Sequence, residues 1–480
     1  MDYDVIVVGG GLGGLTAGAK LAREGRKVLL IEQHSQPGGC ATTFKRGDYT
    51  LEVGLHEMDG PSPRDMKNRI FSELGVTDKV KLVKVPEFYR FLCRNVDITV
   101  PHDPAEAATV LKGRFPSETA GIDNYFDQIL NPKRKGAGGE PLPEMSVGDW
   151  LDSIINDEDL KLVLLGNLGY FHDDPYSLSM TYYNIAQGSY YGGGGASFIK
   201  GGSQMLSDHL ARFISDHGGE VLLSHKVKGL TTDNGVVTGV TFSSKRGSRE
   251  ELLTATASEI VMNNAPLHFA EWLPEEYRTK LTNELAKQKT GASLLTVYFG
   301  FNNNLSVIGS RHYSTFVFDD SIERQSDIIK NNHAGFDRRS FTFVDYGRID
   351  SALAPEGSSV GAICCTDYLA DWEGLTKNDY RRKKEEVAEI FIARMEKILP
   401  GFRKKVDYCE VGTAATVNRY TLAPGGAVYG FAQVPAKPSV DASALPGNVH
   451  IASAWGKTGG GFSGAIFGGY LCAYNILRKK

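Results

Sequence analysis

One pattern near the amino terminus restricts the fold more than any other feature of this sequence. The run Val5–Val8 is apolar and β-branched, which is typical of a parallel strand buried on both faces. A turn with the spacing G-x-G-x-x-G follows, then a helical pattern, and then a second apolar strand, Val28–Ile31, that leads directly to Glu32. Strand, glycines, helix, strand and acid in this order predict a dinucleotide-binding βαβ unit.

Each part of this unit has a physical task. Gly9 permits the tight turn, Gly11 lets the backbone approach a pyrophosphate, and Gly14 allows close packing of the helix on the strand. The start of the helix offers unpaired N–H groups and a positive dipole to the phosphates, and Glu32 can accept hydrogen bonds from ribose hydroxyls. A glycine-rich turn alone is common in proteins, but five features in register favour a dinucleotide over a purely structural turn.

The residues after Glu32 resemble a known family. Gly38 and Gly39 follow the acid, and the run 51–54 has the order hydrophobic, acid, any residue, glycine. This arrangement resembles the FAD-dependent family of phytoene desaturases, carotenoid isomerases and retinol saturases, with the flavin amine oxidases as more distant relatives. In that family the glycine pair lies along the FAD diphosphate, and the second segment leads towards the flavin. Glu52 stands where an aspartate is more usual.

Three later segments extend the resemblance. The segment Ile199–Val240 resembles the family's shared middle part, in which backbone groups near Val227 face the adenine; a strand pair without a ligand is the alternative. Residues 413–430 resemble the branch of carotenoid isomerases and retinol saturases. The strand Val449–Trp455, a glycine loop and a closing helix from Gly459 onward are similar to the end of the family's FAD domain, where the helix start stabilises the flavin edge.

The G-x-G-x-x-G turn with Glu32 and the resemblance to the family together imply FAD as the cofactor. Many relatives place an acid in the closing loop to hold the ribityl chain, and this sequence has none between Ala452 and Gly464. The expected cofactor contacts are Gly9, Gly11, Leu12, Gly13, Gly14, Glu32, Gly38, Gly39, Thr43, Val227, Gly460 and Gly461.

The expected fold class is α/β. A discontinuous Rossmann-like FAD-binding domain is expected from residues 1–60, 195–268 and 440–480. Residues 61–194 and 269–439 are expected to form a substrate domain of mixed β-sheet and helices, including a helical lid. Alternating patterns at Ser293–Phe301, Ser340–Asp345 and Val360–Thr366 predict its sheet, and Lys, Gly and Pro at 131–143 predict an exposed linker.

Composition excludes several classes of function. The net charge of −4 offers no basic surface for nucleic acid, and six scattered cysteines are too few for a disulfide scaffold. Neither a targeting segment nor an apolar run long enough to cross a membrane is evident, so we expect a cytoplasmic protein, either free or peripheral to a membrane. Because no second strand–G-x-G-x-x-G–helix unit follows, electrons are expected to come from or go to an external partner, unless the reaction is redox-neutral.

Candidate acid–base residues lie in two places. His56 and Glu57 follow Gly54, in the loop expected under the flavin, where they can donate or relay a proton; the alternative is that His56 satisfies a backbone group and Glu57 faces water. Arg419 and Tyr420 precede a glycine-rich loop expected to approach the substrate from the other side, although Arg419 can equally be a structural ion-pair partner. No metal site is expected, and the motifs of zinc and serine hydrolases are missing.

Three hypotheses on function stay open. The first is an FAD-dependent oxidoreductase or isomerase that acts on carbon–carbon double bonds of a polyene or prenyl-type lipid by hydride transfer with flavin N5. Residues 413–430 favour saturases and isomerases over desaturases. The second is a flavin amine oxidase, whose aromatic cage the region Tyr182–Tyr191 can supply. The third is a non-catalytic binder of prenylated partners, similar to Rab escort proteins, against which the intact glycines and Glu32 argue.

Overall fold

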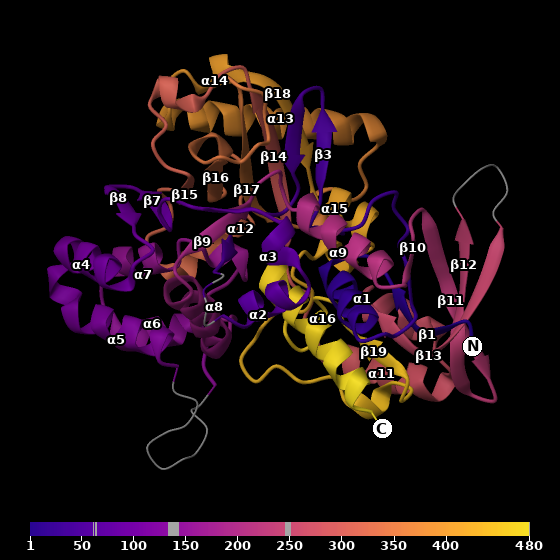
Figure 1. Ribbon diagram of the computed structural model, residues 1–480. Coiled ribbons are helices and arrows are strands. Elements are labelled where there is room, and N and C mark those ends of the chain that lie inside the picture. The colour runs from indigo at the N-terminus through magenta and orange to yellow at the C-terminus, as the bar shows by residue number, and fades with distance from the viewer. Residues whose placement is uncertain (61, 63–64, 133–143, 245–250, 480) are drawn as a thin grey trace, which may run out of the picture.

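Two large sheets organise the chain in the computed structural model, which describes residues 1–60, 62, 65–132, 144–244 and 251–479 (Figure 1). Within these residues each large sheet has seven strands, and two smaller sheets connect them. The predicted linker at 131–143 lies almost wholly outside the described residues. The expected α/β class is confirmed.

The first sheet is built around the amino-terminal strand. Strand β1 (Tyr3–Val8) pairs in parallel with β2 (Val28–Ile31) on one side and with β13 (Leu252–Met262) on the other. These strands are almost entirely apolar and buried where they pair, as a parallel sheet covered on both faces requires. The strand order is β10-β2-β1-β13-β12-β11, with β19 beside β13. The further strands are β10 (Glu220–Leu222), β11 (His225–Asp233), β12 (Val236–Ser244) and β19 (Val449–Ile451).

Three helices cover one face of this sheet (Figure 1). Helix α1 (Leu12–Arg23) contacts both α9 (Gln204–Asp216) and α16 (Gly461–Arg478). Glycines allow the close approach of α1 and α16: a Cβ atom added to Gly469 would lie 2.1 Å from the carbonyl oxygen of Gly13. The carboxyl-terminal helix therefore packs directly on the start of the amino-terminal one.

The second sheet has the order β18-β14-β17-β16-β15-β7-β8 and is mixed, because β15 pairs in parallel with β7 while the other neighbours are antiparallel. Helix α13 (Lys377–Ile398) packs on it through Phe391 and Met395. The three predicted strands are confirmed as β14, β16 and β17. The bounds are β7 (Tyr89–Cys93), β8 (Val96–Val100), β14 (Ser293–Phe301), β15 (Ser314–Val317), β16 (Phe341–Asp345), β17 (Ser359–Asp367) and β18 (Val406–Gly412).

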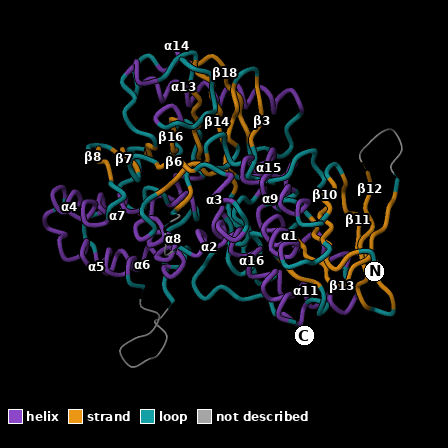
Figure 2. Tube along the Cα trace, viewed as in Figure 1, coloured by secondary structure: helices purple, strands orange, loops and turns teal. Residues whose placement is uncertain are grey.

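A helical region lies beside the second sheet, on the side of the molecule away from the β11–β12 hairpin (Figure 2). Tyr125, Trp150 and Tyr183 form its aromatic core. No helix of the described part of the chain is both long and apolar enough to span a bilayer. The helices of this region are α4 (Pro104–Arg114), α5 (Thr119–Leu130), α6 (Val147–Ile154), α7 (Glu158–Leu164) and α8 (Met180–Gly192).

Short elements join these parts. We propose that the two large sheets are the centres of the two predicted domains, with the boundaries given above. The remaining elements are β3 (Thr43–Arg46), β4 (Tyr49–Glu52), β5 (Met58–Asp59), β6 (Leu82–Lys84), β9 (Ala196–Ile199), α2 (Met66–Glu73), α3 (Val76–Lys79), α10 (Pro266–Phe269), α11 (Glu275–Leu285), α12 (Ile328–Asn332), α14 (Phe402–Lys405) and α15 (Ala414–Thr421).

Candidate active site

The turn between β1 and α1 is shaped by backbone contacts with Glu32. The buried carboxylate of Glu32 accepts a hydrogen bond from the N–H of Gly10 at 2.7 Å and one from the N–H of His34 at 2.8 Å. Gly11 is the residue before α1, and no side chain caps the helix from this position. The N–H of Gly14 donates to Oδ1 of Asn263 at 2.9 Å, so one amide of the first turn is already paired, and the helix dipole at this end still suits an anionic ligand.

The other predicted glycines of this region crowd the same turn. A Cβ atom at Gly13 would lie 1.9 Å from the carbonyl oxygen of Ala452, and one at Gly14 would lie 2.2 Å from that of Gly9. Leu12 is buried in the first turn of α1. The positions need glycine because backbone atoms from three segments meet there.

Gly38 and Gly39 lie directly against this turn. The N–H of Gly38 donates to the carbonyl oxygen of Gly10 at 2.7 Å, and Gly11 and Gly38 form a parallel bridge. Gly38 has φ of +129° and Gly39 of +61°, backbone conformations that other residues rarely adopt. The structure thus places the two predicted glycine motifs side by side.

Val227 lies close to Glu32 in the chain fold, and Thr43 lies close to Gly202. Strand β11 begins beside the acid, since the N–H of His225 donates to the carbonyl oxygen of Glu32 at 2.9 Å, and Val227 is buried two residues later. Thr43 begins β3, and its methyl group faces Gly202 closely enough that a Cβ there would lie 2.4 Å away.

The closing loop, which leads into α16, packs against Tyr429 and Tyr182. Gly460 precedes α16 and Gly461 begins it, with φ of +72°. A Cβ atom at Gly460 would lie 2.5 Å from the Cα atom of Tyr429, and one at Gly459 would lie 3.4 Å from the ring of Tyr182. The start of α16 therefore faces aromatic residues from two other segments.

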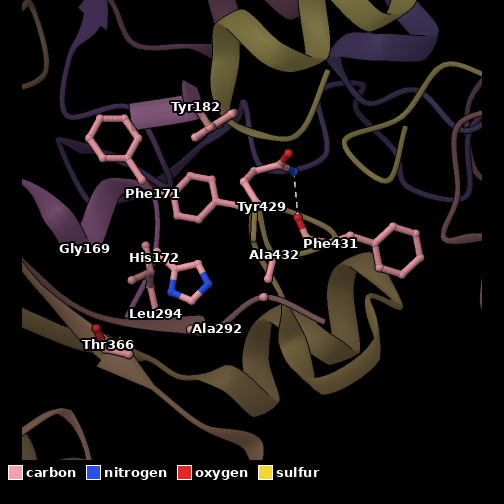
Figure 3. A pocket seen from close by; sticks show the side chains of 12 residues that line it. Gly169, Phe171, His172, Tyr182, Ala292, Leu294, Thr366, Tyr429, Phe431 and Ala432 are labelled. Carbon is pink, nitrogen blue, oxygen red and sulfur yellow. Dashed lines mark hydrogen bonds between the residues drawn. The ribbon is translucent and has the colours of Figure 1, made fainter. Parts of the chain in front are cut away.

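A cavity lies beside this loop (Figure 3). The cavity is small in this structure, with a volume of about 10 Å³, which is room for about one water molecule. Figure 3 shows the imidazole of His172 among Phe171, Ala292 and Leu294, with the ring of Tyr429 pointing towards Phe171. Sequence reasoning missed the cavity because its wall comes from four segments far apart in the chain: Gly169, Phe171, His172 and Tyr182; Gly291, Ala292 and Leu294; Thr366; and Tyr429, Phe431, Ala432 and Gln433.

His56 and Glu57 are both buried, so the alternative in which Glu57 faces water is wrong. Neither carboxyl oxygen of Glu57 has a hydrogen-bond partner within the described residues. Burial, with the charges of Glu87 and Asp59, raises the pKa of Glu57 well above its ordinary value, which favours the neutral acid at neutral pH.

A tyrosine connects His56 to the cavity wall. Nδ1 of His56 lies 3.1 Å from the hydroxyl of Tyr170, and burial lowers the pKa of His56 to about 4, so the ring is neutral at neutral pH. Neither His56 nor Glu57 lines the cavity, but Tyr170 stands between Gly169 and Phe171, which do. The hydroxyl of Tyr313 donates to the carbonyl oxygen of His56 and fixes this loop.

Arg419 and Tyr420 are exposed near the end of α15, apart from His56. The carbonyl oxygen of Tyr420 lies 2.6 Å from Nε2 of His34, in the loop after Glu32. Among the described residues Arg419 has no ion pair, and its guanidinium lies over the ring of Tyr420. The structure therefore does not bring the two predicted catalytic pairs together.

A buried ion pair that sequence reasoning missed lies at the start of α16. Nζ of Lys67 lies 2.8 Å from the carboxylate of Asp59 and 2.8 Å from the hydroxyl of Ser463, which also donates to Asp59. Burial alone would raise the pKa of Asp59, but the charge and hydrogen bond of Lys67 lower it. The sequence has no acid in the closing loop, and the structure supplies Asp59 there from β5.

Comparisons with known proteins agree with this geometry. The family model described as "Flavin containing amine oxidoreductase" matches residues 12–477, nearly the whole chain. The chain belongs to this family. Among relatives, the chloroplastic prolycopene isomerase of Daucus carota is 26% identical over 89% of this chain and 72% of its own. The all-trans-retinol 13,14-reductase of Danio rerio is 23% identical over 100% of this chain and 86% of its own.

Solved structures share the fold of this chain. An oxidoreductase from Methanosarcina mazei has a TM-score of 0.67 at 16% identity and covers 99% of this chain and 100% of its own. A putrescine oxidase bound to putrescine has a TM-score of 0.63 at 16% identity, with both chains covered fully. These likenesses confirm the fold.

This member of the flavin-containing amine oxidoreductase family is an enzyme, and its cofactor is FAD. The residues present fit the group, because no side chain caps α1 from Gly11 and the buried carboxylate of Glu32 lies against the same turn. Glu32 would hold the ribose, the first turn of α1 the diphosphate, and the start of α16 the flavin. FAD supplies hydride chemistry when bound.

Proposed function

We propose that this enzyme reduces, oxidises or isomerises carbon–carbon double bonds of a long polyene or prenyl-type substrate by hydride transfer with flavin N5. The cavity beside Gly459–Gly461 carries the proposal. Its wall is largely aromatic and aliphatic, and it contains no Asp, Glu, Lys or Arg side chain. A hydrocarbon chain offers few groups for hydrogen bonding, so a wall of this kind binds it without leaving charges buried and unpaired.

The names of the relatives support this substrate class. A prolycopene isomerase and an all-trans-retinol 13,14-reductase each match most of the chain. One name denotes an isomerisation and the other a reduction, so the relatives support double-bond chemistry in either form.

We propose Glu57 as the proton donor, with His56 and Tyr170 between it and the cavity. Burial raises the pKa of Tyr89, Tyr170 and Tyr190 well above the ordinary value, and a charge on Glu57 would add to each shift, so the Glu57 carboxyl group is within electrostatic reach of these side chains. A neutral acid in this position holds a proton that is shielded from solvent. The contacts of Tyr420 with Gln33 and His34 favour a role for Tyr420 and its neighbour Arg419 near the ribose of the cofactor over contact with the substrate.

Two partners complete the proposal. Electrons are exchanged with an external donor or acceptor unless the reaction is an isomerisation. Because long polyenes dissolve in bilayers, we also propose that the enzyme contacts a membrane surface when it takes up substrate. Liposome flotation tests this contact, and protein that stays out of the lipid fraction contradicts it.

Mass spectrometry of extracted lipids tests the function. Cells with and without the protein are compared, and the purified FAD-loaded enzyme is then given the lipid that changes. A shift of two hydrogens is expected for reduction or oxidation, and an unchanged mass with altered retention for isomerisation. A lipid profile that does not change in polyenes or prenyl lipids overturns the proposal.

An amine substrate is the second candidate, because Tyr182 and Tyr429 both line the cavity beside the closing loop. Two aromatic rings in such a place can enclose a substrate amine. Release of hydrogen peroxide during turnover of aliphatic amines would support this candidate, and its absence with a panel of mono- and diamines would leave the polyene.

A further inference from the structure

A groove open to solvent lies along the carboxyl-terminal helix. It has a volume of about 730 Å³ and shares no lining residue with the small cavity beside the closing loop. Helices α1, α2 and α16 form it, and Figure 1 shows α2 next to α16. Its charged and aromatic lining residues are Lys20 and Arg23 of α1, Arg69 and Glu73 of α2, and Tyr470 and Tyr474 of α16.

Glu73 holds one side of the groove in shape. Its carboxylate pairs with Nζ of Lys20 and, at 3.1 Å, with the guanidinium of Arg23. It also accepts a hydrogen bond from the hydroxyl of Tyr470 at 2.6 Å. The side chains of Lys20 and Glu73 are only 10% and 15% exposed, so these contacts belong to the packed surface. The wall is therefore formed before a partner binds, which lowers the entropy lost on binding.

The groove carries more positive than negative charge. Three of its lining side chains are cationic and one is anionic, whereas the whole chain has a net charge of −4. Arg69 is exposed and has no ion pair among the described residues, and the ring of Tyr474 is also exposed. Arginine and tyrosine are enriched among the residues that supply binding energy at protein interfaces. The surface therefore suits a negatively charged partner.

The shape and the charge of the groove favour a protein as this partner. Small-molecule sites are enclosed and largely apolar, but this groove is open, and apart from the two tyrosines every lining side chain is polar or charged. Surfaces that bind anionic lipids carry about four to eight Lys or Arg residues. Here Lys20 and Arg23 already pair with Glu73 and Glu24. A protein partner gains from a few placed arginines and tyrosines as well as from net charge.

The groove lies close to the start of α16, which would hold the flavin. Tyr470 follows Ser463 by seven residues, about 10 Å along the helix axis. On α2, Nζ of Lys67 lies 2.8 Å from the hydroxyl of Ser463, and Arg69, two residues later, lines the groove. An electron can cross such a distance through packed protein, whereas a hydride needs direct contact. A partner in the groove is therefore placed for electron transfer.

We propose that this groove is the docking surface of the external electron partner, and that the partner is a small acidic protein that carries one electron at a time. This inference rests on the proposed function, in which reduction or oxidation of the substrate needs such a partner. Two carrier molecules each give up one electron and are oxidised. With two protons from water, these electrons convert bound FAD to its two-electron-reduced form, and an acceptor reverses the same steps. Encounters of this kind are small in area and depend on salt.

Reduction by a known carrier tests the proposal without any lipid substrate. The FAD-loaded enzyme is mixed anaerobically with a reduced plant-type ferredoxin, an acidic [2Fe–2S] protein, and loss of the oxidised-flavin absorbance gives a second-order rate constant. This constant is expected to fall at least about tenfold when the ionic strength rises from about 0.01 M to about 1 M, which shortens the Debye length from about 30 Å to about 3 Å. Deazariboflavin reduced by light, a small uncharged reductant, is expected to show little dependence on salt.

Variants identify the surface. Arg69→Glu is expected to slow reduction by ferredoxin at least about fivefold at an ionic strength of about 0.1 M, where charges more than about 10 Å apart are largely screened. Its FAD content and its reduction by deazariboflavin are expected to stay unchanged. Arg69→Lys keeps the charge and is expected to retain most of the rate. The matched control is Arg381→Glu, the same change at an exposed arginine of α13, which is expected to match the wild type.

The outcomes separate this inference from the proposed function. Failure of ferredoxin to reduce the enzyme, a rate that does not depend on salt, or equal rates in Arg69→Glu and Arg381→Glu overturns the groove as the docking surface and leaves double-bond chemistry in place. Flotation of the wild type but not of Arg69→Glu with phosphatidylserine vesicles, together with equal ferredoxin rates, assigns the groove to a lipid surface instead. Failure of the chemically reduced or oxidised enzyme to convert any polyene overturns the proposed function, and the ferredoxin rates still decide the role of the groove.

Discussion

At the scale of single residues, Glu57 is the side chain whose burial has the clearest consequence. Its pKa is raised above the ordinary value of 4.5, so above that pH the unfolded chain loses a proton that the folded chain keeps. The free energy of unfolding therefore falls as pH rises, by up to about 1.4 kcal/mol per pH unit from this group. Glu57→Gln has no proton to lose, so its stability relative to the wild type is expected to increase from pH 5 to pH 8.

Urea unfolding at four pH values measures this slope. The exposed Glu356 offers a control, since Glu356→Gln is expected to follow the wild type at every pH. If Glu57→Gln and Glu356→Gln have the same pH dependence, Glu57 is not held neutral by the fold.

The same variant tests the proposed proton donor. Glu57→Gln and His56→Ala are each expected to keep a full complement of FAD and to slow turnover at least about tenfold, because a positioned acid typically contributes about 10²–10⁴-fold. Flavin absorbance and initial rates with the identified lipid measure the two quantities. Unchanged rates would remove both residues from the mechanism.

At the scale of secondary-structure elements, the contact between α1 and α16 depends on a glycine. A Cβ atom at Gly469 would lie 2.1 Å from the carbonyl oxygen of Gly13, and neither backbone can move without displacing the dinucleotide turn. Gly469→Ala is expected to destabilise the protein by about 2 kcal/mol or more and to lower the FAD content. Gly113→Ala is the matched control, because a Cβ there meets nothing within 4 Å in α4 and a helical alanine stabilises by up to about 1 kcal/mol.

The ion pair at the start of α16 gives a second prediction at this scale. Lys67→Met leaves the buried carboxylate of Asp59 without a cation, which is expected to cost about 3–5 kcal/mol of unfolding free energy. The double variant Asp59→Asn, Lys67→Met is expected to recover the part of this loss that comes from Asp59, but not the part from Asp65, whose carboxylate lies 3.3 Å from Nζ of Lys67. The exposed pair of Lys280 and Glu276 is the control, where Lys280→Met is expected to leave stability nearly unchanged. A loss at Lys67 no larger than at Lys280 would contradict the buried pairing.

At the scale of elements, the sequence predicts some features of the fold and misses others. Local patterns predict β1, α1 and β2 closely, and the turn at Asn234 and Gly235 joins β11 to β12 as the Asp-Asn-Gly sequence indicates, with φ of +48° and +80°. His172 carries no comparable signal, because a histidine followed by two aspartates in a loop has no spacing that denotes a site. Its place in the cavity wall arises from Leu294, Thr366 and Tyr429, which only the tertiary fold brings beside it.

At the scale of the whole molecule, FAD is expected to act as a structural link between distant segments. The predicted contacts come from residues 9–43, Val227 and the start of α16, so the cofactor would join parts of the sheet and its helices that are otherwise connected through β13 and the packing of α1 on α16. A ligand that binds only the folded state stabilises it by RT ln(1 + [L]/Kd), about 2.7 kcal/mol at a hundred times the Kd. Thermal unfolding of the stripped protein is expected to shift upward with added FAD in proportion to the logarithm of its concentration. FMN lacks the adenosine half that Glu32 would hold, so it is expected to shift the transition much less. An equal shift with FMN would show that the glycine turn and Glu32 do not bind the dinucleotide. The residues proposed for the two ends of the site would then have to be assigned anew.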